Sequence, residues 1–120
     1  MTSLPEPFAS WFTARGWHIH AHQSDLLARA ASPCLLLVAP TGGGKTLAGF
    51  LPTLLELSDG RHAGLHTLYI SPLKALAADI RRNLSRPIAE MGLPVRVEDR
   101  TGDTSYSKRQ RQRADPPHIL

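Results

Sequence analysis

The sequence has one cysteine and no long apolar run, and each shortage excludes a class of protein. Cys34 alone cannot form an internal disulfide and has no CxxC partner for a zinc ion, so we expect a small buried residue in an apolar strand. No apolar run is long enough to cross a bilayer, and the N-terminus lacks the basic and apolar stretches of a secretory signal. The sequence therefore predicts a cytoplasmic protein with no membrane partner.

Acidic residues are also scarce, because 10 acids face 14 bases and leave a formal net charge of +4. This excess permits an anionic partner without requiring one. The arginines concentrate late in the chain, at Arg81, Arg82 and Arg86 and in the run KRQRQR at 108–113. These charges alone fit a solvated helix face as well as a nucleic-acid contact, so KRQRQR is a candidate phosphate contact and no more.

Hydrophobic periodicity predicts a mixed series of helices and strands. Short apolar or alternating runs predict strands at 34–40, 66–72 and 94–99. Helical spacing and breaker residues predict helices at 8–15, 22–30, 47–60, 73–92 and 104–115. Pro52 and Pro87 are expected to bend or shorten their helices. The alternation of strand and helix is typical of a three-layer α/β fold with a parallel sheet and crossover helices.

The apolar residues of HIL at 118–120 begin a further element. Because domains rarely end at the start of an apolar strand, we expect the sheet to be incomplete and the chain to be a piece of a larger domain.

The glycine-rich run APTGGGKT at 39–46 fits the P-loop pattern, with Ala39 in place of the first glycine. A predicted strand precedes it and a predicted helix follows it, as phosphate binding requires. Gly42, Gly43 and Gly44 would let backbone amides curl around a phosphate, and the helix N-terminus would add the positive end of its dipole. The run therefore predicts a nucleotide-phosphate site.

The polar residues of this run predict the chemistry of that site. Thr41 lies within the loop and is assigned to nucleotide binding with the glycines. Lys45 would reach the β and γ phosphates of ATP, and the Thr46 hydroxyl would bind Mg²⁺. We therefore predict ATP and Mg²⁺ as cofactors, with Lys45 and Thr46 as the catalytic residues of this chain.

The segment HIHAHQ at 18–23 has two interpretations. His18, His20 and His22 would share one face of a strand and could bind a metal ion. The residues that follow have a helical pattern, however, and no carboxylate or cysteine stands nearby in the sequence. Gln23 could instead present its side-chain amide to the edge of adenine, as donor and acceptor together.

Three motifs in order resemble those of superfamily 2 DEAD/DEAH-box helicases. APTGGGKT, YISPLKALAAD at 69–79 and RTGDTS at 100–105 resemble motifs I, Ia and Ib. The segments SPLKALA and FLPTLLEL are similar in sequence to those of Lhr-like helicases, including the bacterial branch associated with DNA ligase. RGWHIHAHQ resembles the Gln motif, which implies that Gln23 contacts adenine. The resemblance implies N-terminal helices with the Gln motif in 1–31 and the first part of a RecA-like domain in 32–120.

The resemblance also implies an ATP-dependent helicase or translocase that acts on single-stranded or tailed DNA rather than RNA, in repair. It places Ser71, Pro72 and Lys74, and further along Thr101 and Gly102, near the phosphates of one strand. A helix N-terminus near Pro72 would offer amides and a positive dipole to those phosphates. Backbone contacts of this kind carry little sequence preference. A second RecA-like domain is expected in the rest of the protein.

A P-loop site needs a carboxylate near its magnesium ion, and this chain offers no good candidate. Glu98 and Asp99 follow a predicted strand, but Arg96 interrupts the apolar run that usually leads into such an acid. Asp103 belongs to the TGD of the motif Ib resemblance. The resemblance implies a DEAH-like box beyond residue 120, so we expect the catalytic carboxylates to lie outside the chain and the chain alone to be inactive.

Two other classes stay open. A small-molecule kinase would need an acceptor-binding lid and would have no reason to contain SPLKALA or TGD. A short non-catalytic module that binds nucleotide or nucleic acid would have to end at Leu120.

Overall fold

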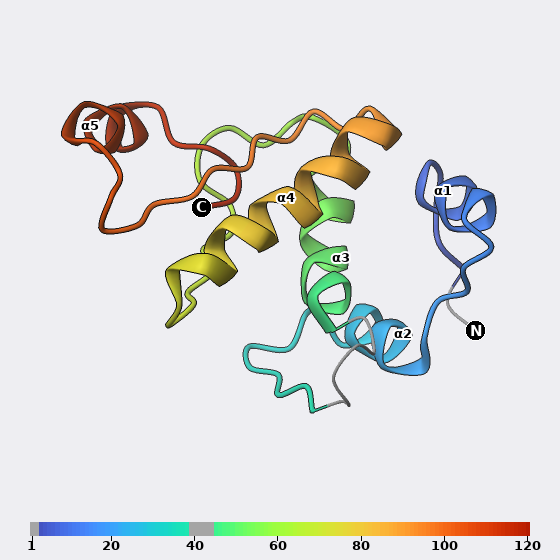
Figure 1. The fold of residues 1–120 in the computed structure, drawn as a ribbon. Helices are drawn as coiled ribbons and strands as arrows, with labels where there is room; N and C mark the ends of the chain where they lie inside the picture. The colour runs from blue at the N-terminus through green and yellow to red at the C-terminus, as the bar shows by residue number, and fades with distance from the viewer. Residues whose placement is uncertain (1–2, 39–44) are drawn as a thin grey trace. The chain divides into compact units, whose positions relative to one another are not determined.

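The computed structural model describes residues 3–38 and 45–120, and within these residues the chain forms five helices. Figure 1 shows them in chain order as α1 (Phe8–Ala14), α2 (Ala21–Ala28), α3 (Lys45–Leu57), α4 (Lys74–Met91) and α5 (Tyr106–Ala114). Each corresponds to a predicted helix, with small differences at the ends. The chain divides into two compact units, residues 1–56 and 57–120. No described helix is long and apolar enough to cross a membrane.

Aromatic residues organise the start of the first unit. Phe8 and Phe12, one turn apart on α1, are almost fully buried. The rings of Trp11 and Trp17 pack edge-on at 5.5 Å, and the Arg15 guanidinium lies 4.7 Å from the centre of the Trp11 ring. Stacking of this kind adds stability beyond the buried area itself. α1 ends before Gly16, whose φ of +65° suits a residue without a side chain.

Neither internal proline ends its helix. α3 continues through Pro52, and α4 continues through Pro87 to Gly92, which caps it with a φ of +64°. Pro87 therefore does not shorten α4, whereas the bend expected at Pro52 stays a prediction. Ala48, Leu51 and Leu54 on α3 have no exposed surface, and burial of this apolar face offsets the hydrogen bond that Pro52 cannot donate.

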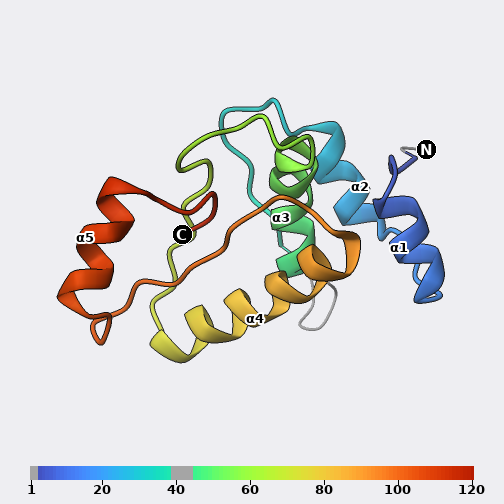
Figure 2. The ribbon, with the colours of Figure 1, turned by 90° about the horizontal axis from the view of Figure 1, so that it is seen from above.

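In the second unit, three segments far apart in sequence meet side by side. Thr67 and Val97 each form a parallel bridge with Ile119, which is 1% exposed. The Thr67 amide donates to the His118 carbonyl at 2.9 Å, and the Glu98 amide donates to the Ile119 carbonyl at 3.1 Å. Residues 118–120 therefore lie between the segments around Thr67 and Val97, and α4 connects these two segments (Figures 1 and 2). This is the parallel crossover arrangement that the sequence predicts, in rudimentary form.

The predicted strands themselves do not form, because the residues at 3–38 and 45–120 show isolated bridges only. A ladder needs a partner of matching length, and residues 118–120 are too short to pair with the whole of 66–72 or 94–99. Residues 34–38 take part in none of these bridges, and Leu36 is 89% exposed. Cys34 is exposed as well, so the prediction that it is buried is wrong.

Candidate nucleotide and nucleic-acid sites

The predicted phosphate loop leads directly into α3, which begins at Lys45. Thr46 is exposed in the first turn of α3, and that turn contains no acidic residue. The positive end of the α3 dipole therefore has no carboxylate within that first turn. The loop residues predicted to bind phosphate lie outside the described residues, so their contacts stay predictions: Thr41, Gly42, Gly43 and Gly44.

Gln23 is buried, with 2% of its surface exposed, in the first turn of α2. Its Oε1 accepts a hydrogen bond from the His20 amide at 2.9 Å, the reciprocal contact of a capping box. The side chain therefore fixes the start of α2. The adenine contact of Gln23 stays a prediction.

The histidine metal hypothesis is wrong for the described residues. His20 caps α2 and His22 lies inside it, so His18, His20 and His22 do not alternate along one face of a strand. The rings of His20 and His22 stack at 5.4 Å. Within 3–38 and 45–120, no group of three or more His, Cys, Asp or Glu side chains could hold a metal ion.

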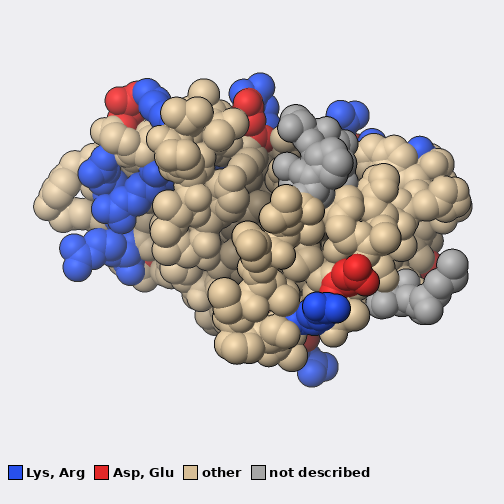
Figure 3. All heavy atoms as spheres, turned by 90° about the horizontal axis from the view of Figure 1, so that it is seen from below, with Lys and Arg blue, Asp and Glu red and all other residues tan. Residues whose placement is uncertain are grey.

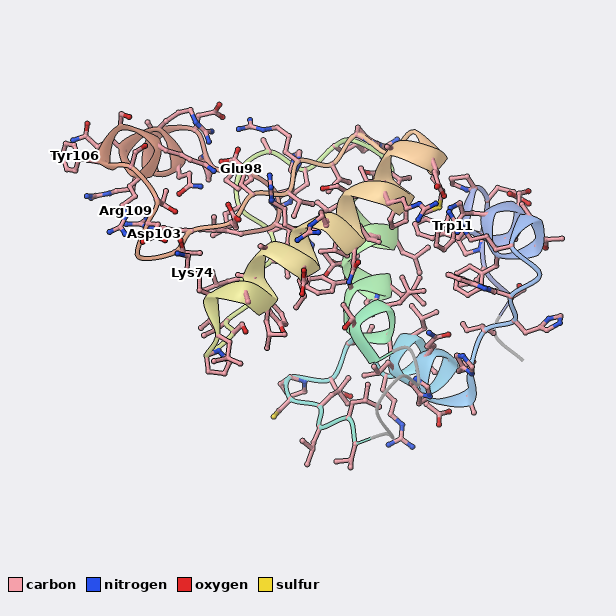
Figure 4. All side chains as sticks on the ribbon, viewed as in Figure 1. Trp11, Lys74, Glu98, Asp103, Tyr106 and Arg109 are labelled. Atoms are coloured by element: carbon pink, nitrogen blue, oxygen red, sulfur yellow. The ribbon has the colours of Figure 1, made fainter. Side chains whose placement is uncertain are left out.

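The residues predicted to contact nucleic acid come from two segments that an ion pair joins. Ser71 Oγ accepts from the Leu73 amide at 3.4 Å, and α4 begins at Lys74, two residues after Pro72. The Lys74 ammonium forms an ion pair with the Asp103 carboxylate, from the loop before α5 (Figure 4). Both side chains are largely exposed. The pair therefore brings the SPLKALA and TGD motifs together at the surface.

The loop at 101–104 is a tight turn held by its own side chains. The Thr101 amide donates to Thr104 Oγ1 at 2.9 Å, and the Asp103 amide donates to Thr101 Oγ1 at 3.2 Å. Gly102 is exposed. Ser105 then caps α5 by accepting a hydrogen bond from the Lys108 amide. The loop thus presents Gly102 to solvent on a fixed backbone.

Arg109 is a contact of this loop that the sequence analysis did not assign. Its Nη2 donates to the Thr101 carbonyl at 2.7 Å and the Gly102 carbonyl at 3.2 Å, and its Nε donates to the Thr104 carbonyl at 3.0 Å. The sequence places Arg109 in KRQRQR without a specific role. No local signal separates Arg109 from the other bases of this run, because its contacts depend on the folded backbone of the loop.

The rest of KRQRQR mostly contacts acids of this chain. Lys108 Nζ lies 3.5 Å from Asp99 Oδ1, and Arg111 pairs with Glu98. Gln112 is buried and donates to Glu98 Oε1 at 3.1 Å. Figure 3 shows that Lys and Arg side chains gather on the part of the second unit where α5 lies, with acids among them. Much of the run therefore fastens α5 to residues 98–99, and Arg113 remains exposed.

Glu98 is the centre of this network. Burial of its carboxyl opposes ionisation, but hydrogen bonds from Arg111, Gln112 and Arg96 outweigh it and lower its pKa from 4.5 to about 2. Arg96 Nη2 lies 3.3 Å from Glu98 Oε2. Asp99 pairs with Lys108 and with Arg81 on α4, at 3.6 Å. Both acids thus have structural partners, which agrees with the view that neither is the magnesium carboxylate.

Comparison with known proteins gives one family. The DEAD/DEAH box helicase family matches residues 20–120. ATP-dependent helicase Lhr-Core protein 2 of Thermococcus barophilus is 38% identical over 98% of this chain, which spans 15% of that relative. Lhr helicase/uracil glycosylase of Escherichia coli is 36% identical over 98% of the chain, which spans 9% of it. The chain therefore covers a small part of these relatives.

A solved structure agrees with the sequence relatives. The chain is similar to the Mycobacterium smegmatis helicase Lhr bound to ssDNA and AMP-PNP, with a TM-score of 0.79 and 37% identity over 97% of this chain and 16% of that one. The match confirms a RecA-like helicase fold, although the described residues show helices and bridges only. The chain therefore belongs to the DEAD/DEAH box helicase family, in which it is similar to part of the Lhr helicases.

Proposed function

We propose that this chain is part of an Lhr-type ATP-dependent helicase that binds ATP through residues 39–46 and single-stranded DNA through the loops before α4 and α5. The single observation that carries the proposal is the similarity to an Lhr helicase bound to ssDNA and AMP-PNP over nearly the whole chain. The ion pair of Lys74 with Asp103 supports it, because it brings the two predicted DNA segments together. DNA rather than RNA, a role in repair and a cytoplasmic location are parts of the same proposal.

Within this function, each group of residues has a separate task. Lys45 and Thr46 would hold the ATP phosphates and Mg²⁺, and Gln23 would select adenine. When bound, Mg²⁺ supplies charge neutralisation between the phosphates. Ser71, Pro72, Lys74, Thr101 and Gly102 would hold the DNA backbone without reading bases. The catalytic carboxylates and a second RecA-like domain would come from the rest of the protein.

The test is ATP hydrolysis by the complete protein that contains this sequence, with and without single-stranded DNA. A rate that rises with DNA supports the helicase proposal. A rate of ATP hydrolysis that neither DNA nor RNA changes would instead favour another P-loop enzyme such as a small-molecule kinase. Absence of hydrolysis together with DNA binding would favour a non-catalytic module.

Gln23→Glu is expected to weaken ATP binding selectively. Glutamate keeps the oxygen that accepts from the His20 amide, so α2 stays capped, but it lacks the N–H donors that adenine requires. We expect the Kd for ATP to rise by about tenfold, from the loss of one or two hydrogen bonds, and the Kd for GTP to change little. Nucleotide titrations measure both constants. Equal weakening of ATP and GTP would show that Gln23 does not select adenine.

Asp103→Asn is expected to tighten binding of single-stranded DNA. The change removes the negative charge that pairs with Lys74 and leaves this ammonium available for a phosphate. We expect Kd to fall by about threefold at low salt, and the gain to shrink as salt screens the charges. Asp79→Asn removes the same charge from the exposed pair with Arg82 on α4 and is the matched control. Equal effects of the two changes would assign the gain to net charge.

A further inference from the structure

Three backbone carbonyls of the loop at 101–104 point at one guanidinium. Arg109 donates to Thr101 and Gly102 through Nη2 and to Thr104 through Nε, at 2.7 to 3.2 Å. Arg109 is half-buried, so water competes only in part for these bonds. A planar guanidinium presents its donors at fixed angles, which an ammonium group cannot do. Arg109 therefore fixes the loop from its carbonyl side.

This arrangement decides which backbone groups a ligand meets. Carbonyl oxygens repel phosphate, whereas amides and hydroxyl groups attract it. With the carbonyls of Thr101, Gly102 and Thr104 bound by Arg109, fewer of them are left to face an approaching anion. A Cβ built on Gly102 would meet nothing within 4 Å, so the loop backbone is open there to a ligand. The exposed backbone at Gly102 is thus the part of the loop that a phosphate can approach, since the amides of Thr101, Asp103 and Thr104 donate within the loop.

We propose that Arg109 is a positioning residue for single-stranded DNA, which holds the loop at 101–104 in the conformation that binds the DNA backbone. The inference rests on the proposed function, because it deepens the DNA contact assigned to Thr101 and Gly102. Arg109 acts through the loop, since its Nε and Nη2 donate to loop carbonyls. A substitution that keeps the positive charge but removes the planar guanidinium should therefore weaken DNA binding.

The experiment compares Arg109→Lys with Arg113→Lys in the complete protein, with a deoxythymidine oligonucleotide as the probe. Both changes conserve charge on α5, but Arg113 is exposed and makes none of the loop contacts. ATP hydrolysis is followed as a function of DNA and of ATP concentration. We expect Arg109→Lys to raise the KM for DNA by about tenfold, which corresponds to the loss of one or two charged hydrogen bonds. The maximal rate and the KM for ATP should stay within about twofold, and Arg113→Lys should match the wild type in all three.

Three results would overturn the inference. Arg109→Lys could keep the wild-type KM for DNA, which would show that the fork is not needed. Arg113→Lys could raise this KM equally, which would show a general property of α5. Arg109→Lys could raise the KM for DNA and for ATP and lower both the maximal rate and the melting temperature. This result would show that Arg109 has a purely structural role. If DNA does not stimulate the wild type, the proposed function fails first, and this outcome is distinct from all three.

Discussion

Lys45→Ala is expected to abolish ATP binding and turnover by the complete protein while the fold is kept. Lys45 is the first residue of α3 and directly follows the predicted phosphate loop. In the P-loop pattern, this is the lysine that binds the β and γ phosphates. Alanine removes that charge but favours the helix. We expect ATP affinity and kcat each to fall by about 100-fold or more, the usual effect of removing a donor that stabilises developing charge.

The control for Lys45→Ala is Arg61→Ala, which removes one positive charge from an exposed residue after α3. Nucleotide titration and steady-state hydrolysis are measured for both variants, and circular dichroism reports the helix content. Arg61→Ala should behave as the wild type. An unchanged ATP affinity in Lys45→Ala would remove the nucleotide site from the P-loop run, and with it the central part of the proposed function.

The helices could be predicted from the sequence because their signals are local. The spacing of Phe8 and Phe12 and the glycines after α1 and α4 depend on residues within one or two turns. Prolines were the exception. The sequence shows the hydrogen bond that Pro52 loses but not the complete burial of Leu51 and Leu54 that offsets it.

The strands could not be predicted to the same extent, since a strand depends on a distant partner. The periodicity of 66–72 and 94–99 indicates extended chain, but among the described residues only 118–120 pair with both. Their three residues limit the ladder to single bridges. The same reason applies to Cys34, whose apolar neighbours predict burial, whereas no bridge covers this segment within the described residues.

The site residues also differ in how far the sequence could predict them, because some contacts depend on the folded backbone. The motif order pointed to Lys74 and to the TGD loop, and the structure joins them through Asp103. The motif order could not identify Arg109, because the contacts of this residue depend on the direction of three carbonyls in a folded turn. In the sequence, the only reason against Glu98 as a magnesium ligand was that Arg96 interrupts the apolar run before it. In the structure Arg96 contacts that carboxylate directly.

Glu98→Ala is expected to release α5 from the rest of the second unit. The side chain of Glu98 is 18% exposed, and its carboxylate binds Arg111, Gln112 and Arg96. The pKa lowered from 4.5 to about 2 means that the folded state stabilises the ionised carboxyl, by less than the shift alone implies because water screens the exposed Arg96 and Arg111. Because the pKa in the folded state lies below the ordinary value, this stabilisation is complete above about pH 4.5 and is lost as the pH falls towards 2.

Hydrogen exchange of the complete protein at neutral pH measures this effect, in the peptide that covers α5. We expect protection of that peptide to fall by about tenfold in Glu98→Ala, because the buried Gln112 loses one acceptor while Arg96 and Arg111 regain water. Glu90→Ala removes the partner of Arg86 from an exposed pair on α4 and should change protection of α4 by less than about threefold. Equal losses from the two changes would contradict a central role for Glu98. In the wild type, acid should release α5 over the same range of pH in which Glu98 becomes protonated, and the loop that Arg109 holds should lose its support at the same time.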